Sequence, residues 1–261
     1  DTAMTITTST GDDSIAMDNK ADVLDGGTGT DTLVVGGNGV LGGFAVDLSS
    51  TTDQVTQYGG VANAAVQKGF ESVNLGAVTG TFGSDVTGSD KANTITVNDQ
   101  NSNVDGGKGN DTISGGEGTD VLKGGAGDDT FVIRTVKDYF SATGGTSVGE
   151  DTITGGTGTD TIALEAITIA VGDDWQPNKI SGINSITVNT ASATAFSLTT
   201  DDDFFSDTGI SIIDFSADTN TTGTNVINIS NDDAVAQAFT LTGGAGVEQI
   251  TGDGGVDTIT P

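Results

Sequence analysis

Large apolar residues recur every nine positions along two parts of the chain. In the longer part they are Ile95, Val104, Ile113, Leu122 and Phe131. In the earlier part they are Ile15, Leu24 and Leu33. Each stands between polar or β-branched neighbours, which is typical of a short strand with one buried face. The pattern therefore predicts many strands of about three residues, repeated at a fixed interval.

The residues between these strands follow the pattern Gly-Gly-x-Gly-x-Asp. Complete nine-residue copies start at Gly26, Gly106, Gly115, Gly124 and Gly155. Because glycine tolerates positive φ, we expect all three glycines of each copy to turn the chain sharply and to expose carbonyl oxygens. The aspartate adds a carboxylate to every turn. Carbonyl and carboxylate oxygens are hard ligands that suit Ca²⁺, so these turns are candidate calcium sites.

Two nonapeptides make one coil of eighteen residues, with its strands in two facing sheets. Consecutive coils then stack as parallel strands about 4.8 Å apart. Each turn lies above the turn that is eighteen residues earlier, and a cation can sit between them. We therefore predict three stacked pairs in particular: Asp13 with Asp31, Asn93 with Asp111, and Asp111 with Asp129.

The repeats divide the chain into segments. We predict rolls at about 8–34, 88–132, 146–163 and 243–260, irregular β rungs at 35–87 and 164–242, and an insertion at 133–145. Residues 62–68 are predicted as a helical or loop turn. The string Gly69-Phe-Glu-Ser-Val-Asn-Leu75 has a counterpart in Gly182-Ile-Asn-Ser-Ile-Thr-Val188, which favours a larger repeating unit. We expect residues 1–261 to be one largely continuous β-solenoid and a fragment of a longer protein.

The charge of the chain is strongly unbalanced. Its 37 acidic and 8 basic residues give a formal net charge of −29, and 41 of the 261 residues are glycine. Without bound cations, repulsion between the acids should oppose compaction. Each nonapeptide also buries only one large apolar residue. We therefore expect the rolls to be disordered at submicromolar calcium and to fold at millimolar calcium.

The composition also excludes several kinds of chemistry. There is no cysteine and no histidine, which removes disulfides, thiolate chemistry and the commonest general base. No apolar run approaches the length of a membrane span, so we predict no membrane insertion. The acidic surface disfavours nucleic acid as a partner. We predict no catalytic residues and no enzymatic activity.

The nonapeptides resemble the calcium-binding repeats of the RTX family of secreted bacterial proteins. The resemblance implies an all-β fold, a right-handed parallel β-roll or β-helix solenoid, with several Ca²⁺ ions in the glycine-rich turns. It also implies type I secretion and an extracellular or cell-surface location. In the family, calcium is held by carbonyls of the Gly-Gly-x-Gly stretch and by the Asp carboxylate. Asn93, Ser102 and Glu248 depart from this pattern.

Carried onto this chain, the resemblance gives a set of predicted calcium ligands. They are Asp13, Asp22, Gly26, Thr28, Asp31, Gly106, Gly107, Lys108, Gly109, Asp111, Gly115, Glu117, Asp120, Gly124, Ala126, Asp129, Asp151, Gly155, Thr157, Asp160 and Asp257.

The irregular strands, rich in Thr, Ser, Asn and Ala, resemble RTX-type surface-layer proteins and large adhesins. The leading hypothesis is a calcium-dependent extracellular module of a surface layer or scaffold, which self-associates into a lattice or packs on neighbouring segments of its own chain. One alternative is a segment of a calcium-dependent adhesin that binds a polysaccharide or cell surface. A second is the accessory roll of a secreted hydrolase or epimerase. The aromatic residues Tyr139, Phe140 and Trp175 fit either a cap or a sugar-stacking surface.

Overall fold

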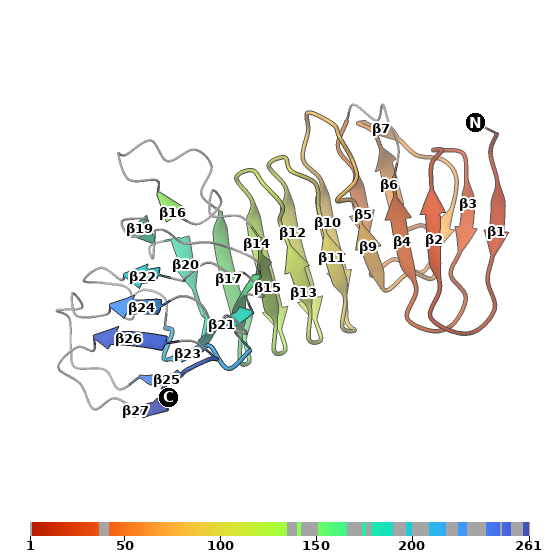
Figure 1. The fold of residues 1–261 in the computed structure, drawn as a ribbon. Helices are drawn as coiled ribbons and strands as arrows, with labels where there is room; N and C mark the ends of the chain where they lie inside the picture. Colours follow the sequence, from red (N-terminus) through yellow and green to blue (C-terminus); the bar gives the residue numbers. More distant parts are fainter. Residues whose placement is uncertain are drawn as a thin grey trace. The chain divides into compact units, whose positions relative to one another are not determined.

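A computed structural model describes residues 2–36, 42–134, 140–141, 151–165, 174–175, 179–189, 197–199, 209–217, 224–228, 239–245, 247–251 and 258–260. The chain divides into two compact units, residues 1–129 and 130–261. The described residues form strands and turns without an α-helix, which confirms the predicted all-β class (Figure 1). A single continuous solenoid over the whole chain stays a prediction. No helix in the described ranges is long and apolar enough to cross a membrane.

The first unit contains three sheets whose strands are mainly parallel. One sheet contains, in order, β2 (Ser14–Met17), β4 (Thr32–Val35), β9 (Ser72–Asn74), β11 (Thr94–Thr96) and β13 (Thr112–Ser114). A second contains β14 (Val121–Ala126), β12 (Asn103–Lys108), β10 (Asp85–Ser89), β5 (Ala45–Asp47), β6 (Val55–Tyr58) and β7 (Val61–Ala62). A third contains β1 (Thr5–Thr7), β3 (Val23–Asp25) and β8 (Gln67–Lys68). The strands of the second sheet from β10 to β14 lie side by side in Figure 1.

The register between neighbouring strands confirms the eighteen-residue coil. Thr94 of β11 lies opposite Thr112 of β13, and Asn103 of β12 lies opposite Val121 of β14; 112 − 94 and 121 − 103 are both 18. The same offset joins Ser14 of β2 to Thr32 of β4. Because the period is constant in these stretches, every coil repeats the turns of the coil before it.

The core lies between the two larger sheets. Ile95 and Ile113 enter it from one sheet, and Val104 and Leu122 enter it from the other; all four are at most 2% exposed. Their neighbours on β11, β12 and β14 are exposed or half-buried, as the alternation of a strand requires. The nine-residue apolar pattern therefore identifies the inward positions of this unit correctly.

Residues 42–98 depart from the simple coil. Strand β6 pairs antiparallel with both β5 and β7, so this part contains a hairpin excursion in place of parallel rungs alone. The Phe44 and Tyr58 rings meet edge to face, with centroids 4.9 Å apart and an angle of 74° between their planes. The stretch predicted as a helical or loop turn contains the end of β7 and all of β8. The parallel pairing resumes when β9 joins β4 and β11.

The second unit is also built mainly from parallel strands. Its main sheet contains β15 (Thr130–Ile133), β18 (Thr161–Glu165), β21 (Ser185–Asn189), β23 (Ile212–Asp214), β25 (Thr240–Thr242) and β27 (Thr258–Thr260). Smaller groups are β17 (Thr152–Thr157) with β20 (Ile180–Ser181), and β22 (Ser197–Thr199) with β24 (Thr224–Asn228) and β26 (Val247–Thr251). Strand β16 (Phe140–Ser141) pairs antiparallel with β19 (Asp174–Trp175).

The offsets in the second unit vary. Thr130 pairs with Thr161 and Thr161 with Ser185, offsets of 161 − 130 = 31 and 185 − 161 = 24. Thr240 pairs with Thr258, which restores 258 − 240 = 18. Parallel pairing thus runs through described parts of the segment predicted as irregular rungs. Most of the insertion at 133–145, with Tyr139, lies outside the described residues.

Candidate calcium-binding turns

The sixth residues of successive turns form a column along one edge of the first unit. We call it the main column: Asp13, Asp31, Glu71, Asn93, Asp111 and Asp129. The backbone N–H of Asp13 donates to Oδ1 of Asp31 at 2.8 Å, and that of Asn93 donates to Oδ1 of Asp111 at 2.7 Å. The backbone N–H of Asp111 donates in turn to Oδ1 of Asp129 at 2.8 Å. These contacts confirm the three predicted stacked pairs.

A shorter column occupies the opposite edge, where the chain turns from β11 to β12 and from β13 to β14. We call it the opposite column: Ser84, Ser102 and Asp120. The backbone N–H of Ser84 donates to Oγ of Ser102 at 3.0 Å, and that of Ser102 donates to Oδ1 of Asp120 at 2.7 Å. In each of these contacts, one side-chain oxygen at position six ties a coil to the coil before it.

The second carboxylate oxygen is in a different environment. Oδ2 of Asp31 and Oδ2 of Asp111 are buried and have no hydrogen-bond partner. A buried oxygen of this kind is costly when it is charged and unpaired. Burial raises the pKa of both carboxyl groups, that of Asp111 to about 7. The N–H of Asn93 opposes the rise in the pKa of Asp111, and the charge of Asp129 adds to it. A cation beside Oδ2 would remove this cost.

The glycines of the turns have two separate roles. Those at positions two and four of the five complete copies have positive φ: Gly27, Gly29, Gly107, Gly109, Gly116, Gly118, Gly125, Gly127, Gly156 and Gly158. This backbone conformation is the one that glycine adopts readily and other residues rarely do.

The expectation that the first glycine also has positive φ is wrong. A Cβ added at Gly106 would stand 2.5 Å from Oδ2 of Asp111, and one at Gly115 would stand 2.5 Å from Oδ2 of Asp120. The first glycine is required because the carboxylate packs against its Cα.

The donor set of these turns suits calcium held mainly by carbonyl groups. Within the described ranges, no three acidic side chains gather closely enough to hold a metal by themselves. Calcium takes about six to eight oxygen ligands, including backbone carbonyls. Residues 106–109 with Asp111 and residues 124–127 with Asp129 would hold the ion. A bound ion would neutralise the buried carboxylates and link neighbouring coils.

The comparison with known families agrees with this geometry. A family model described as the RTX calcium-binding nonapeptide repeat (4 copies) matches residues 79–112, 87–122, 97–131, 146–166 and 240–259. The chain carries RTX calcium-binding repeats. Proteins with RTX repeats bind calcium and are typically secreted, which indicates a calcium-dependent secreted module. No curated protein matches the chain.

The turn at residues 26–31 has RTX geometry although the matched ranges do not include it. Gly27 and Gly29 have positive φ, and Oδ2 of Asp31 is buried. In the second unit, Gly156 and Gly158 have positive φ, and Oδ2 of Asp151 and of Asp160 is buried. The turns at 26–31 and 155–160 therefore share the local features of the turns at 106–111 and 124–129.

Some predicted ligands have other contacts. Asp22 uses both carboxylate oxygens, which accept the N–H groups of Met4 at 2.9 Å and Asn19 at 3.1 Å. The carbonyls of Thr28 and Ala126 accept the N–H groups of Gly11 and Gly109, at 3.0 and 2.8 Å.

The side chain of Lys108 pairs with Asp90 at 2.8 Å and is exposed. Asp257 lies outside the described residues, and Glu117 donates its N–H to Oδ1 of Asp99 at 3.2 Å. The ligand assignments remain predictions, and Asp22 differs most from the RTX geometry of Asp31 and Asp111.

Two further residues make the same kind of contact between coils, and the sequence did not identify them as candidates. Glu71 accepts the backbone N–H of Asp31 at 3.0 Å through Oε2. In the second unit, Oδ1 of Asn184 accepts the backbone N–H of Asp160 at 2.7 Å. Both occupy the same place in the repeated strings that begin at Gly69 and Gly182. The repetition of those strings was therefore the signal that could have identified them.

Proposed function

We propose that this RTX chain is a calcium-dependent structural module of an extracellular surface layer or scaffold. It folds when calcium binds after secretion, and it then associates with other copies or with neighbouring segments of its own chain. The buried Oδ2 atoms of Asp31 and Asp111 carry the calcium part of the proposal. The net charge of −29 adds to it, because compaction of so acidic a chain is favoured by bound cations.

The regular outer surface of the sheets supports a role in assembly. Thr94 of β11 and Asp85, Asn103 and Asp105 of β10 and β12 are exposed on strands of constant spacing. Such a surface offers the same polar groups at about 4.8 Å intervals, which suits repeated contacts between copies. Calcium in the turns would keep these strands in one register.

Electron microscopy of the purified chain tests the proposal. We expect ordered two-dimensional sheets at millimolar calcium and none in excess chelator. The variant Asp31→Asn/Asp111→Asn should form fewer sheets at the same calcium concentration, whereas Asp18→Asn, at an exposed position outside the strands, should assemble like the parent chain. A chain that is folded in calcium but stays monomeric at every concentration would contradict the scaffold role.

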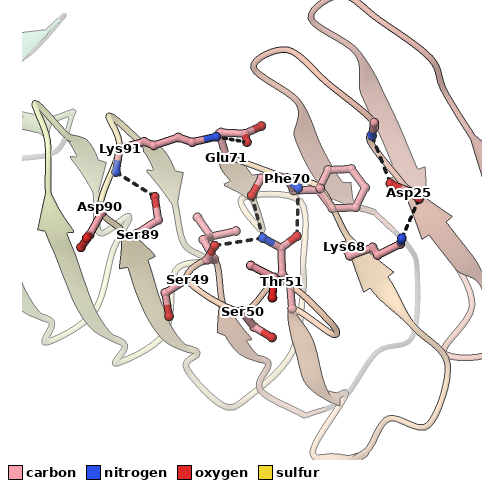
Figure 2. A pocket seen from close by; sticks show the side chains of 14 residues that line it. Asp25, Ser49, Ser50, Thr51, Lys68, Phe70, Glu71, Ser89, Asp90 and Lys91 are labelled. Atoms are coloured by element: carbon pink, nitrogen blue, oxygen red, sulfur yellow. Dashed lines mark hydrogen bonds and ion pairs between the residues drawn. The ribbon is translucent and has the colours of Figure 1, made fainter.

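A pocket favours a second candidate, the calcium-dependent adhesin. It has a volume of about 580 Å³, and its lining includes Ser49, Ser50, Thr51, Lys68 and Lys91 (Figure 2). Hydroxyl and charged groups around one cavity can hydrogen-bond to a saccharide. A glycan array in calcium tests this candidate. Binding that falls with Ser49→Ala/Thr51→Ala but not with Thr94→Ala would support the adhesin over the scaffold.

We propose no catalytic role for this chain. The sequence has no histidine and no cysteine, so the common nucleophile and base pairs cannot be formed from it. The remaining alternative, an accessory roll of a secreted hydrolase or epimerase, requires a catalytic domain elsewhere in the same polypeptide. The sequence that flanks this chain in its gene tests that alternative directly.

A further inference from the structure

We propose that residues 42–98 form a calcium-independent core, and that the turns on either side of it fold onto this core when calcium binds. The inference rests on the calcium binding proposed above for the RTX turns. Within the main column, the turn at residues 88–93 would then need no calcium, whereas the RTX turns on either side of it would need the ion. The residues that decide between them are Glu71, Lys91 and Asn93.

The turn at residues 88–93 is satisfied without a cation. Nδ2 of Asn93 donates to the carbonyl of Glu71 at 2.6 Å and to Oγ of Ser89 at 3.0 Å. Oδ1 of Asn93 accepts the backbone N–H of Ser89 at 2.6 Å. The NH₂ group of Asn93 therefore has two hydrogen-bond acceptors. The equivalent atom of Asp111, Oδ2, is buried and has no hydrogen-bond donor. Ser89 and Lys91 replace the two glycines that have positive φ in the RTX turns.

Glu71 is satisfied by the chain's own cation. Its Oε1 pairs with Nζ of Lys91 at 2.9 Å (Figure 2). Its Oε2 accepts the N–H of Asp31 at 3.0 Å. The Glu71 side chain is only 16% exposed, so an unpaired charge there would be unfavourable. The ammonium group of Lys91 therefore neutralises the Glu71 carboxylate, as a calcium ion would neutralise the Asp111 carboxylate.

Buried amide side chains hold the rest of this core. Nε2 of Gln54 donates to the carbonyls of Leu48 at 3.0 Å and Phe70 at 2.8 Å, and Oε1 of Gln54 accepts the N–H of Phe70 at 2.9 Å. Nδ2 of Asn63 donates to Oε1 of Gln67 at 2.5 Å. Neutral amides satisfy each other at any calcium concentration, so these contacts need no metal.

The apolar core is also larger here than in the RTX turns. Three aromatic side chains, Phe44, Tyr58 and Phe70, are buried in residues 42–98, whereas the coils at 103–132 bury one, Phe131, with Val104, Ile113, Leu122 and Val132. Aromatic side chains remove more apolar area from water than aliphatic ones. The core can therefore be stable without calcium. Its strands β9, β10 and β11 then give β4, β12 and β13 an edge on which to pair.

Hydrogen exchange of the whole chain, in chelator and in calcium, tests the proposal. In chelator we expect the amides of residues 42–98 to exchange at least about tenfold more slowly than those of residues 103–129. In calcium we expect both segments to be protected. If both segments exchange fast in chelator and are protected together in calcium, the calcium function stands and the separate core is wrong. If calcium protects neither segment, the calcium function itself is wrong.

Two variants that each replace one asparagine by aspartate make the test more specific. Asn93→Asp replaces the self-satisfied amide by a carboxylate, and in chelator it should speed exchange at residues 85–98 about tenfold. Asn110→Asp makes the same change at an exposed position whose Oδ1 accepts the N–H of Asp128 at 3.0 Å, and it should change that exchange by less than about twofold. Equal effects of the two variants would overturn the proposal.

If Asn93→Asp does not fold, two variants of the Glu71–Lys91 ion pair test the same proposal. Lys91→Gln leaves the Glu71 carboxylate without its cation and should speed exchange at residues 69–75 about threefold in chelator. Adding Glu71→Gln removes the charge and should restore protection to within about twofold. If the double variant exchanges as fast as Lys91→Gln, the ion pair does not substitute for calcium and the proposal is wrong.

Discussion

The backbone N–H of Asp111 donates a hydrogen bond of 2.8 Å to Oδ1 of Asp129, eighteen residues further along the chain. One oxygen of the carboxylate thus joins two coils. The second oxygen of the Asp111 carboxylate, Oδ2, is buried and has no hydrogen-bond partner, so only a cation or a proton would satisfy it. Serine and glutamate supply the first oxygen at Ser102 and Glu71, without a buried second oxygen that needs a cation. Asn93 joins the coil before it through Nδ2 instead, which donates to the carbonyl of Glu71.

Asp111→Asn should have opposite effects with and without calcium. In chelator it removes a buried charge and should stabilise the fold by roughly 2–4 kcal/mol at neutral pH. In saturating calcium it removes ligands from a site and should destabilise the fold by about 2–4 kcal/mol. Urea unfolding in the two conditions measures both effects, and calorimetry should show weaker calcium binding. The exposed Asp18→Asn is the control, and equal signs in both conditions would contradict the prediction.

The metal-free fold should be more stable in mild acid than at neutral pH. The pKa of Asp111 is raised in the fold to about 7 from 3.8, so its contribution is present in full below about pH 4 and is lost as the pH rises through about 7. The pKa of Asp31 is raised as well. Circular dichroism in calcium-depleted buffer should therefore show more strand content at about pH 5 than at about pH 8.

Between about pH 5 and about pH 8 the change in strand content should come from the carboxyl groups whose pKa is raised. The pKa of Asp25 is lowered by Lys68, so its contribution is lost only when the pH falls below about 4. Asp111→Asn should reduce the pH dependence. Calcium affinity should rise between about pH 5 and about pH 7, because the ion competes with protons for these carboxylates. Strand content that is lower at pH 5 than at pH 8 would count against the raised pKa values.

Gly106→Ala should weaken the fold through a collision with the carboxylate. The added Cβ would lie 2.5 Å from Oδ2 of Asp111 and 2.6 Å from the carbonyl of Gly124. We expect a loss of roughly 2–3 kcal/mol in calcium, measured by urea unfolding. Gly36→Ala meets nothing within 4 Å and should change stability by less than about 0.5 kcal/mol.

Gly11→Ala isolates the effect of backbone conformation. Gly11 has a φ of +119° and nothing within 4 Å of an added Cβ, so the cost should be about 1 kcal/mol from strain alone. Calcium affinity at the turn 106–111 should be unchanged in this variant. If Gly106→Ala costs no more than Gly11→Ala, the packing role assigned to the first glycine is incorrect.

Gln54→Ala should destabilise the chain equally in calcium and in chelator. The change leaves the carbonyls of Leu48 and Phe70 and the N–H of Phe70 without their side-chain partner. Burying such groups unsatisfied costs about 1–3 kcal/mol each, so for these three groups we expect a total of roughly 3–9 kcal/mol. Thermal unfolding in both conditions measures the loss. Asn103→Ala, which removes only an exposed hydrogen bond to Asp85, should have little effect.

The sequence alone determined the local period of this protein. Because each nonapeptide builds its own turn and strand, the spacing was enough to place Ile113 and Leu122 in the core and to stack Asp111 on Asp129. It was also enough to identify the RTX repeats. These features depend on contacts at a constant offset of eighteen residues, which a repeated pattern encodes directly.

Only the tertiary structure decided what happens where the period is lost. Thr32 pairs with Ser72 and Ser72 lies beside Thr94, so the offsets become 72 − 32 = 40 and 94 − 72 = 22. No local pattern specifies such offsets, because they depend on the hairpin β5–β7 and on the buried amides that close it. The structure therefore places Glu71 in the main column and gives Asn93 the partners that replace a metal. Spacing located the RTX turns, whereas non-local packing decides which turns of the column are satisfied without calcium.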